Sequence, residues 1–308
     1  MSPSARDASP RPPWSRPRPI LVTGMPRSGT TWLARLLAQS PRAAMAGREP
    51  MNPHPGQYRL GGSAKAWVRI EEPTAAEARA IRRAYKGLTP SVYGRYGVRQ
   101  LAAPMPWTRL VVKDPFAVLS LGAVTRVTGA RVVLVHRHPA AMLDSYRRMG
   151  WLPDIDELKP IVERFRARCG PEDMLPDELE TNVRPESAAA LGWFWSSLYS
   201  IALADVRRVK GVLVVSHERI ASDSGACRIL HEALGVTWSA ATDAEFNRTP
   251  SGSTDTQRLH NLDRSPAQTA VAWRDRLDPA EFQELDEMTT RVQSRLHALE
   301  LGARLDGV

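Results

Sequence analysis

An apolar run, a glycine-bounded loop and the start of a helix follow one another in residues 20–33, ILVTGMPRSGTTWL. A loop between a strand and a helix N-terminus offers backbone N–H groups to an anion, and the helix adds partial positive charge. Gly24 and Gly29 have the spacing of the nucleoside-triphosphate phosphate loop, but Thr30 stands where that motif has its lysine. Arg27 lies inside the loop instead. The segment therefore predicts a phosphate-type anion site that holds a different anhydride.

The length and composition favour one globular α/β domain. The 308 residues, 43% of them hydrophobic, suffice for a large core, and strand-like and helix-like segments alternate along the chain. Two cysteines cannot form a disulfide framework, which favours a reducing compartment. No stretch approaches the roughly 18 apolar residues of a membrane span, and no signal-peptide core follows Met1. We therefore expect no transmembrane segment and a cytoplasmic location.

The net charge of +9 is carried mostly by arginine. These arginines are scattered, without a long basic run interleaved with aromatic residues, so the pattern argues against nucleic-acid binding. A polyanionic cofactor would account for part of the charge. A generally high arginine content, with no functional role, would account for the rest.

The first 19 residues are rich in proline, serine and arginine and predict a disordered tail, followed by a single domain over residues 20–308. After the strand that begins at Ile20, the apolar pattern predicts further strands over 108–112, 131–136 and 211–215. Helices are predicted over 32–39, 74–86, 117–128, 140–149, 187–209, 223–234 and 279–301. Irregular segments are expected over 41–62, 170–186 and 247–268. No internal repeat is visible.

Short apolar strands separated by helices predict a parallel sheet flanked by helices on both faces, a P-loop-type α/β fold. Ligands of such sheets bind beyond the carboxyl ends of the strands. Four pairs of residues lie just past predicted strand ends: Thr23-Gly24, Lys113-Asp114, His136-Arg137 and Ser216-His217. We expect them to meet at one rim.

Arg137 and Ser145 predict a second anion site. An arginine at a strand end and a hydroxyl on the following helix suit a phosphate dianion. The alternative is a surface arginine that only caps the strand.

Several of these segments resemble one known family. The run PRSGTTWL, followed by Arg137 and Ser145, is similar to the sulfotransferases that use 3′-phosphoadenylyl sulfate (PAPS). Residues 111–148, VVKDPFAVLSLGAVTRVTGARVVLVHRHPAAMLDSYRR, most resemble the tyrosylprotein sulfotransferase branch, as do GVLVVSHERI, LGVTWS and the run Gly252-Ser-Thr-Asp255. Glu49-Pro50 also resembles the Glu-Pro of carbohydrate sulfotransferases.

The resemblance implies a role for individual residues. Glu49 would be the catalytic base and Lys113 the cation beside the transferred sulfuryl group. Arg27, Ser28, Gly29, Thr30 and Thr31 would bind the 5′-phosphosulfate of PAPS, and Arg137 and Ser145 its 3′-phosphate. Ser253 would close over the nucleotide. His217 stands where the family usually has a tyrosine near the cofactor.

Two of these assignments have simpler alternatives. Glu49 could be an ordinary loop glutamate, and Lys113 could form a salt bridge to Asp114 or another carboxylate, since a buried unpaired ammonium is costly. His136 and His138 could suggest metal ligands, but their i, i+2 spacing brings no cysteine or carboxylate at metal-site spacing. The sequence therefore predicts structural or solvated histidines and no required metal.

The predicted activity is transfer of a sulfuryl group from PAPS to a hydroxyl. The alternatives are a P-loop kinase or NTPase-like protein and a non-catalytic nucleotide binder. The acceptor is open: a tyrosyl group, a glycan, a lipid or a small molecule all offer hydroxyls. The expected cytoplasmic location favours a metabolite or glycolipid, with specificity in residues 51–107 and 150–190. The oligomeric state is not predicted.

Overall fold

The computed structural model describes residues 16–89, 101–170, 174–180, 182–248 and 272–302. Within them, one parallel sheet of five strands has the order β2-β3-β1-β4-β5. The strands are β1 (Ile20–Thr23), β2 (Ala43–Met45), β3 (Arg109–Lys113), β4 (Arg131–His136) and β5 (Val212–Ser216). Because β1 is the central strand, the segment that follows it leaves the middle of the sheet.

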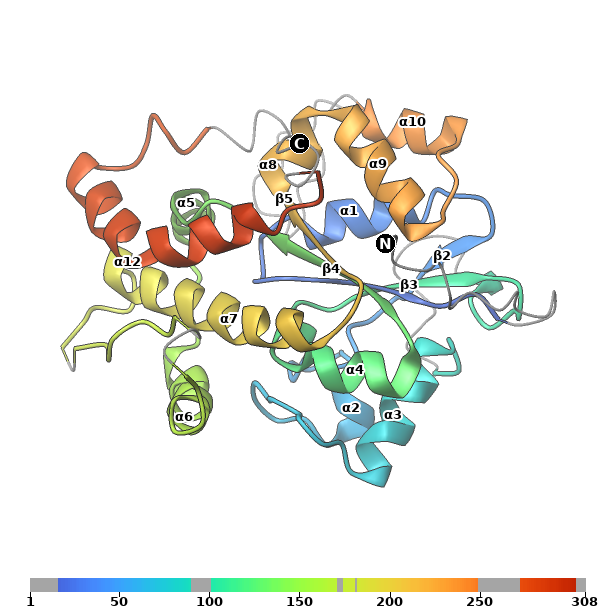
Figure 1. Ribbon diagram of the computed structural model, residues 1–308, viewed down its shortest axis with the longest axis horizontal. Coiled ribbons are helices and arrows are strands. Elements are labelled where there is room, and N and C mark those ends of the chain that lie inside the picture. The colour runs from blue at the N-terminus through green and yellow to red at the C-terminus, as the bar shows by residue number, and fades with distance from the viewer. Residues whose placement is uncertain (1–15, 90–100, 171–173, 181, 249–271, 303–308) are drawn as a thin grey trace, which may run out of the picture.

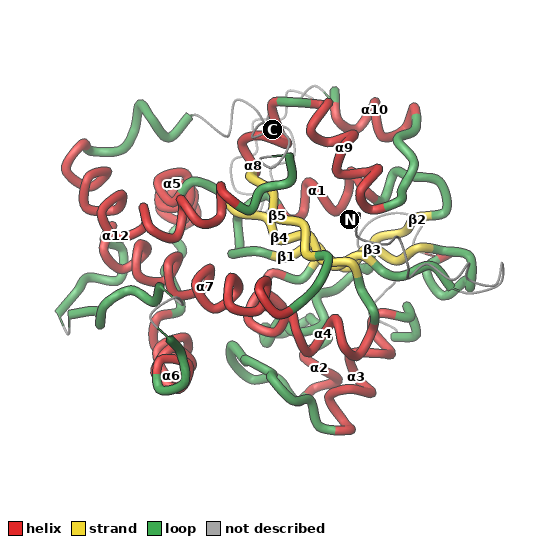
Figure 2. Tube along the Cα trace, in the orientation of Figure 1, coloured by secondary structure: helices red, strands yellow, loops and turns green. Residues whose placement is uncertain are grey.

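Helices cover both faces of the sheet (Figures 1 and 2). On one face lie α1 (Thr30–Leu37), α9 (Ser224–Leu234) and α10 (Ala240–Phe246). On the other lie α2 (Arg59–Gly62), α3 (Ala75–Tyr85), α4 (Leu121–Thr128) and α7 (Ala188–Arg208). The long helix α12 (Pro279–Ala298) runs beside α7. The described residues also form η3 (Pro115–Ser120), a 3₁₀ helix, and the helices α5 (Pro139–Met149), α6 (Ile155–Arg166) and α8 (His217–Ser222).

Alternate residues of each strand enter different halves of the core. Ile20 and Val22 of β1 pack with the apolar side chains of α1 and α9, whereas Leu21 packs with those of α4 and α7. A strand buried on both faces must be apolar throughout, which explains its continuous hydrophobic run. The predicted fold class is confirmed.

Most predicted elements are present with small shifts at their ends. Thr74 caps α3 through a capping box with Glu77, and Gly129 ends α4 with a φ of 64°. The helix predicted from Trp32 begins two residues earlier, at Thr30, directly after the loop. The helix predicted over 117–128 is instead the 3₁₀ helix η3 followed by α4.

The prediction of an irregular segment over 41–62 was wrong at residues 43–45. Ala43–Met45 forms β2, which pairs with β3 at the edge of the sheet. Three small or unbranched residues carry little intrinsic strand preference, so their pairing depends on the neighbouring strand. The predicted tail falls almost entirely outside the described residues, and so do Ser253 and most of 247–268; these stay predictions. Among the described helices, none has the length and hydrophobicity needed to cross a bilayer.

Candidate active site

The glycine-bounded loop fits its surroundings only because of its two glycines. Gly24 has a φ of 147°, and a Cβ there would lie 2.0 Å from the carbonyl oxygen of Val135 on β4. Gly29 has a φ of 93°, and a Cβ there would lie 2.3 Å from Nδ1 of His217. Both positions combine a backbone conformation that favours glycine with a close approach. The loop is therefore pressed between β4 and the start of α8.

No side chain caps the N-terminus of α1, which follows the loop directly. The first N–H groups of a helix have no partner within the helix, so an uncapped start leaves donors for a ligand. Gly29 is the residue before the helix, and no acidic residue lies in the first turn to compete with an anion. An uncapped helix start of this kind is the local structure that an anion site needs, and the anion site itself stays a prediction of the sequence.

Two aromatic residues of α7 hold the loop and the end of β4 together. The Tyr199 hydroxyl donates to the Val135 carbonyl over 2.8 Å and accepts the Met25 N–H over 3.2 Å. The Trp195 indole N–H donates to the Arg137 carbonyl over 3.1 Å. Both rings are fully buried. These side chains belong to the core, and their polar atoms hold the backbone of the loop and of the end of β4 in position.

The two predicted anion sites touch each other. Nε of Arg27 donates to the Ser145 hydroxyl over 3.2 Å, and a guanidinium nitrogen of Arg137 donates to the Arg27 carbonyl over 3.3 Å. Arg137 and Ser145 are buried, which excludes the alternative of a surface arginine. Burial lowers the pKa of Arg137; Glu218 opposes this, and Arg148 and Arg27 add to it. The guanidinium groups of buried Arg137 and partly buried Arg27 create a positive potential at this end of the loop.

His217 forms part of the wall of the loop. Its ring is buried against Gly29, and Trp32 meets it edge-on with ring centroids 5.9 Å apart. Burial, and secondarily Arg137, lowers the pKa of His217 to about 4, so the imidazole is neutral at neutral pH. Its Nδ1 has no hydrogen-bond partner among the described residues. A buried polar atom without a partner is rare in folded proteins and favours an absent ligand or water.

Glu49 and Lys113 form a buried ion pair on the other side of the loop. Lys113 is the last residue of β3 and pairs in register with Val22 of the central strand. Asn52 donates its side-chain amide to the second carboxylate oxygen of Glu49, and Gln57 accepts the Glu49 N–H over 3.0 Å. Of the alternatives left open for Lys113, the structure contains the salt bridge, and its partner is the predicted base itself.

Asp114 fixes the segment that carries Glu49. It is fully buried and accepts the N–H of Met51 over 2.6 Å and that of Phe116 over 3.1 Å. Burial, with the nearby Glu49 carboxylate, raises the pKa of Asp114 to about 8. The Thr23 hydroxyl donates to the Asp114 carbonyl over 2.7 Å, joining this corner to the start of the loop. Asp114 therefore holds the backbone of the segment that carries Glu49 in place.

The strand order explains why the predicted residues meet. Because β1 lies between β3 and β4, the loop emerges with Lys113 on one flank and Arg137 on the other. Sequence reasoning missed Asn52 and the supporting hydroxyl of Tyr199. The short spacing from Glu49 to Asn52 was the one local signal. The Tyr199 contact joins segments more than a hundred residues apart and has no local signal.

The fold and the site define a class: a parallel α/β protein with a glycine-bounded loop at the centre of its sheet and a buried lysine–glutamate pair beside it. Residues 19–168 match the model of the sulfotransferase family. The matched segment therefore runs from the residue before β1 into α6 and includes the loop, the Lys113–Glu49 pair, Arg137 and Ser145.

Solved sulfotransferase structures resemble the chain over most of its length. The sulfotransferase domain from the curacin biosynthetic pathway has a TM-score of 0.50 at 14% identity, covering 91% of this chain and 98% of that chain. The sulfotransferase from Alicyclobacillus acidocaldarius has a TM-score of 0.43 at 17% identity, covering 94% and 98%. The mouse sulfotransferase SULT7A1, solved with PAP, has a TM-score of 0.43 at 14% identity, covering 90% and 85%. No curated protein matches the sequence.

Proposed function

We propose that this protein is a PAPS-dependent O-sulfotransferase. The observation that carries the proposal is the rim itself: one glycine-bounded loop, with the buried Lys113–Glu49 pair on one side and the buried residues Arg137 and Ser145, which both contact Arg27 of the loop, on the other. Transfer of a sulfuryl group needs these three parts, because catalysis of such a loose, in-line transfer rests mainly on positioning and charge stabilisation.

The residues present fit the two anionic ends of PAPS. The unpartnered Nδ1 of His217 and the uncapped start of α1 face the loop that would hold the 5′-phosphosulfate. Thr30 and Thr31 would donate hydroxyl hydrogens there. Arg137 and Ser145, with Arg27 between them, would hold the 3′-phosphate. PAPS supplies the activated sulfuryl group, and the chain supplies orientation and charge.

Glu49 and Lys113 have the complementary roles that the transfer requires. Glu49 would take the proton of the attacking hydroxyl, and Lys113 would neutralise negative charge that develops on the transferred group or the leaving phosphate. Their ion pair keeps base and cation within reach of each other before the substrates bind. Asn52 restricts the rotation of the Glu49 carboxylate, so that one oxygen faces Lys113.

A P-loop kinase or NTPase is the weaker reading. Such a loop would have a lysine at position 30, where this chain has threonine, and that lysine reaches the β- and γ-phosphates. A non-catalytic binder would keep the loop and lose turnover. The retained Lys113–Glu49 pair favours an enzyme, because a nucleotide binder alone has no need of a buried base beside a buried cation.

The acceptor is proposed as a small-molecule or glycan or lipid hydroxyl. The likeness of residues 111–148 to tyrosylprotein sulfotransferases concerns the cofactor and the sulfuryl group, so it does not select a tyrosyl acceptor. The cytoplasmic location from which this preference follows stays a prediction of the sequence.

The proposal is tested by incubating the protein with PAPS and a panel of hydroxyl acceptors, and measuring release of adenosine 3′,5′-bisphosphate. Acceptor-dependent release without added metal and without ATP supports it. Thermal stabilisation by the bisphosphate without turnover on any acceptor would favour the non-catalytic binder. Stabilisation only by ATP with Mg²⁺ would favour the kinase or NTPase reading and would refute the sulfotransferase.

A further inference from the structure

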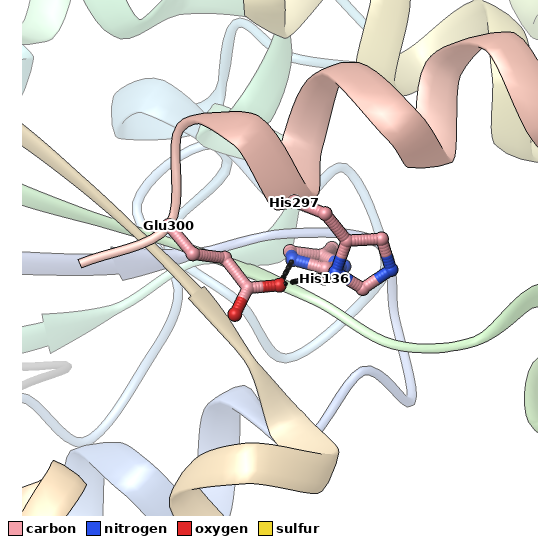
Figure 3. A group of neighbouring side chains, drawn as sticks. All are labelled: His136, His297 and Glu300. Atoms are coloured by element: carbon pink, nitrogen blue, oxygen red, sulfur yellow. Dashed lines mark hydrogen bonds and ion pairs between the residues drawn. The ribbon is translucent and has the colours of Figure 1, made fainter. Parts of the chain in front are cut away.

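Three potential metal ligands meet at the edge of the rim, outside the transfer site. His136 is the last residue of β4, His297 lies in the last turn of α12, and Glu300 follows that helix (Figure 3). Glu300 also forms a β-bridge with Val214 of β5, so its backbone is tied to the sheet. The sequence offered His136 no carboxylate at metal-site spacing, and the fold supplies one from 164 residues away.

The ligand atoms converge on one point. Oε1 of Glu300 lies 3.0 Å from Nε2 of His136 and 2.6 Å from Nδ1 of His297, and all three atoms lie within 4.8 Å of one another. In a tetrahedral zinc site, with bonds of about 2.0 Å, neighbouring nitrogen and oxygen ligands are roughly 3.3 Å apart. To reach that spacing, the His297 ring must move toward His136, because both O–N distances are already short and the 4.8 Å limit therefore concerns the two imidazole nitrogens. The His297 side chain is 57% exposed, which leaves room for this movement.

Burial and charge also favour a cation here. The other two ligands, His136 and Glu300, are buried, so the carboxylate must be compensated by its neighbours. At present the two imidazoles do this by hydrogen bonding. A divalent cation would take the place of both imidazole N–H protons. The carboxylate would attract it more strongly in this buried, low-dielectric site than it would in water. Two imidazoles and one carboxylate form a donor set that zinc uses, with a fourth position left for water on the exposed side of His297.

We propose that His136, His297 and Glu300 form a zinc-type divalent cation site that fastens the end of α12 to the ends of β4 and β5. The site is separate from the proposed sulfuryl-transfer site, for which the sequence predicts no metal. Its consequence for that reaction is indirect: His136 precedes Arg137, so a cation here would hold the strand end from which the Arg137 side chain reaches the loop.

One neighbouring charge opposes the cation and gives a sharp test. A guanidinium nitrogen of Arg219 lies 4.0 Å from Oε2 of Glu300, on the oxygen that the imidazoles do not use. This positive charge weakens binding of a second cation to the same carboxylate. Replacing Arg219 with glutamine should therefore tighten metal binding, an effect that a purely hydrogen-bonded cluster does not predict.

The experiment uses the full chain without a polyhistidine tag, freed of metal by chelation and titrated with Co²⁺ as a spectroscopic substitute for Zn²⁺. We expect one equivalent to give visible absorption of tetrahedral intensity, Zn²⁺ to abolish it, and Zn²⁺ to raise the melting temperature. His297→Asn and Glu300→Gln should each weaken binding at least tenfold, and Arg219→Gln should strengthen it. His54→Asn, which removes an exposed histidine elsewhere, is the matched control and should bind as the wild type does.

The proposal is overturned if the wild-type chain gives no tetrahedral Co²⁺ spectrum, or if His297→Asn binds as tightly as wild type. Because His297 is mostly exposed, that variant should fold, and its circular dichroism checks this independently of metal. The cation titration also requires no PAPS, so failure of the proposed sulfotransferase activity would leave its outcome readable.

Discussion

Arg27 and Ser145 meet across the rim, with Nε of the arginine 3.2 Å from the hydroxyl of the serine. The arginine belongs to the loop after the first strand and the serine to α5, more than a hundred residues later. This hydrogen bond joins the two anion sites that the sequence predicted separately. The loop and the first turns of α5 are therefore held in direct contact at this end of the rim.

Replacing Glu49 with glutamine should lower turnover by about 10²- to 10⁴-fold, because the amide cannot accept the proton of the attacking hydroxyl. The affinity for adenosine 3′,5′-bisphosphate, measured by calorimetry, should change little. Glu163→Gln alters an exposed glutamate on α6 and serves as the control. Wild-type turnover by the Glu49 variant would remove this residue from the mechanism.

Asn52 should act by orienting Glu49 and not by touching the nucleotide. Asn52→Ala is expected to lower kcat by roughly tenfold, the loss of one hydrogen bond to a charged group, with unchanged bisphosphate affinity. Asn52→Asp keeps the shape and adds a like charge, which should move the acid limb of the pH–rate profile to higher pH. A structural role alone would lower stability and leave the position of that limb unchanged.

Arg137→Gln should weaken binding of adenosine 3′,5′-bisphosphate by about 10- to 100-fold, which corresponds to about 1.5–3 kcal/mol for a charged hydrogen bond. Arg126→Gln is the matched control, because its ion pair with Glu72 is exposed and contributes little. Calorimetric titration of both variants distinguishes them. Equal affinities would show that Arg137 only supports the strand end.

Gly29→Ala should abolish bisphosphate binding and destabilise the protein more than Gly56→Ala does. Both glycines have a positive φ, 93° and 83°, so both substitutions add backbone strain of about 1 kcal/mol. Only at Gly29 would the new methyl group also collide with His217, since a Cβ at Gly56 has no atom within 4 Å. Urea unfolding of the pair isolates the steric contribution; identical losses of stability would contradict the close packing of His217 on the loop.

The stability of the fold should depend on pH through His217. Its pKa is lowered to about 4 by burial, whereas in the unfolded chain it has its ordinary value near 6.5. Between these two pH values the unfolded chain binds a proton at His217 that the folded chain does not. The contribution of His217 to the free energy of unfolding is therefore fully present above about pH 6.5 and is lost as the pH falls toward about 4. In His217→Asn this part of the pH dependence should disappear. Urea unfolding of both proteins across that interval measures it, and parallel curves would contradict the buried neutral imidazole.

Local patterns predicted the elements that position the site, and tertiary contacts decided the rest. The apolar strands and the caps at Thr74 and Gly129 are visible in the sequence because they depend on neighbouring residues. The helix α6 was not predicted, since Pro160 lies inside it and interrupts its pattern. The edge strand at 43–45 was missed because its pairing comes from β3.

The same distinction holds for the candidate site. Lys113 and Arg137 were predicted from their positions at strand ends, where parallel sheets gather their ligands. The bond from Met51 to Asp114 joins residues 63 positions apart, and no spacing rule predicts it. Glu300 reaches His136 across an even longer separation, which is why the histidines were interpreted from the sequence as structural or solvated.

Arg27 has a φ of 76°, a conformation that glycine adopts at lower cost. The backbone at this turn would therefore be more relaxed without the guanidinium that the loop carries. That guanidinium instead spans to Ser145 on α5 and lies over the ring of Trp151, so these contacts hold the residue in a conformation that an arginine otherwise avoids. The direction in which Arg27 points is thus fixed by its backbone as well as by its side-chain partners.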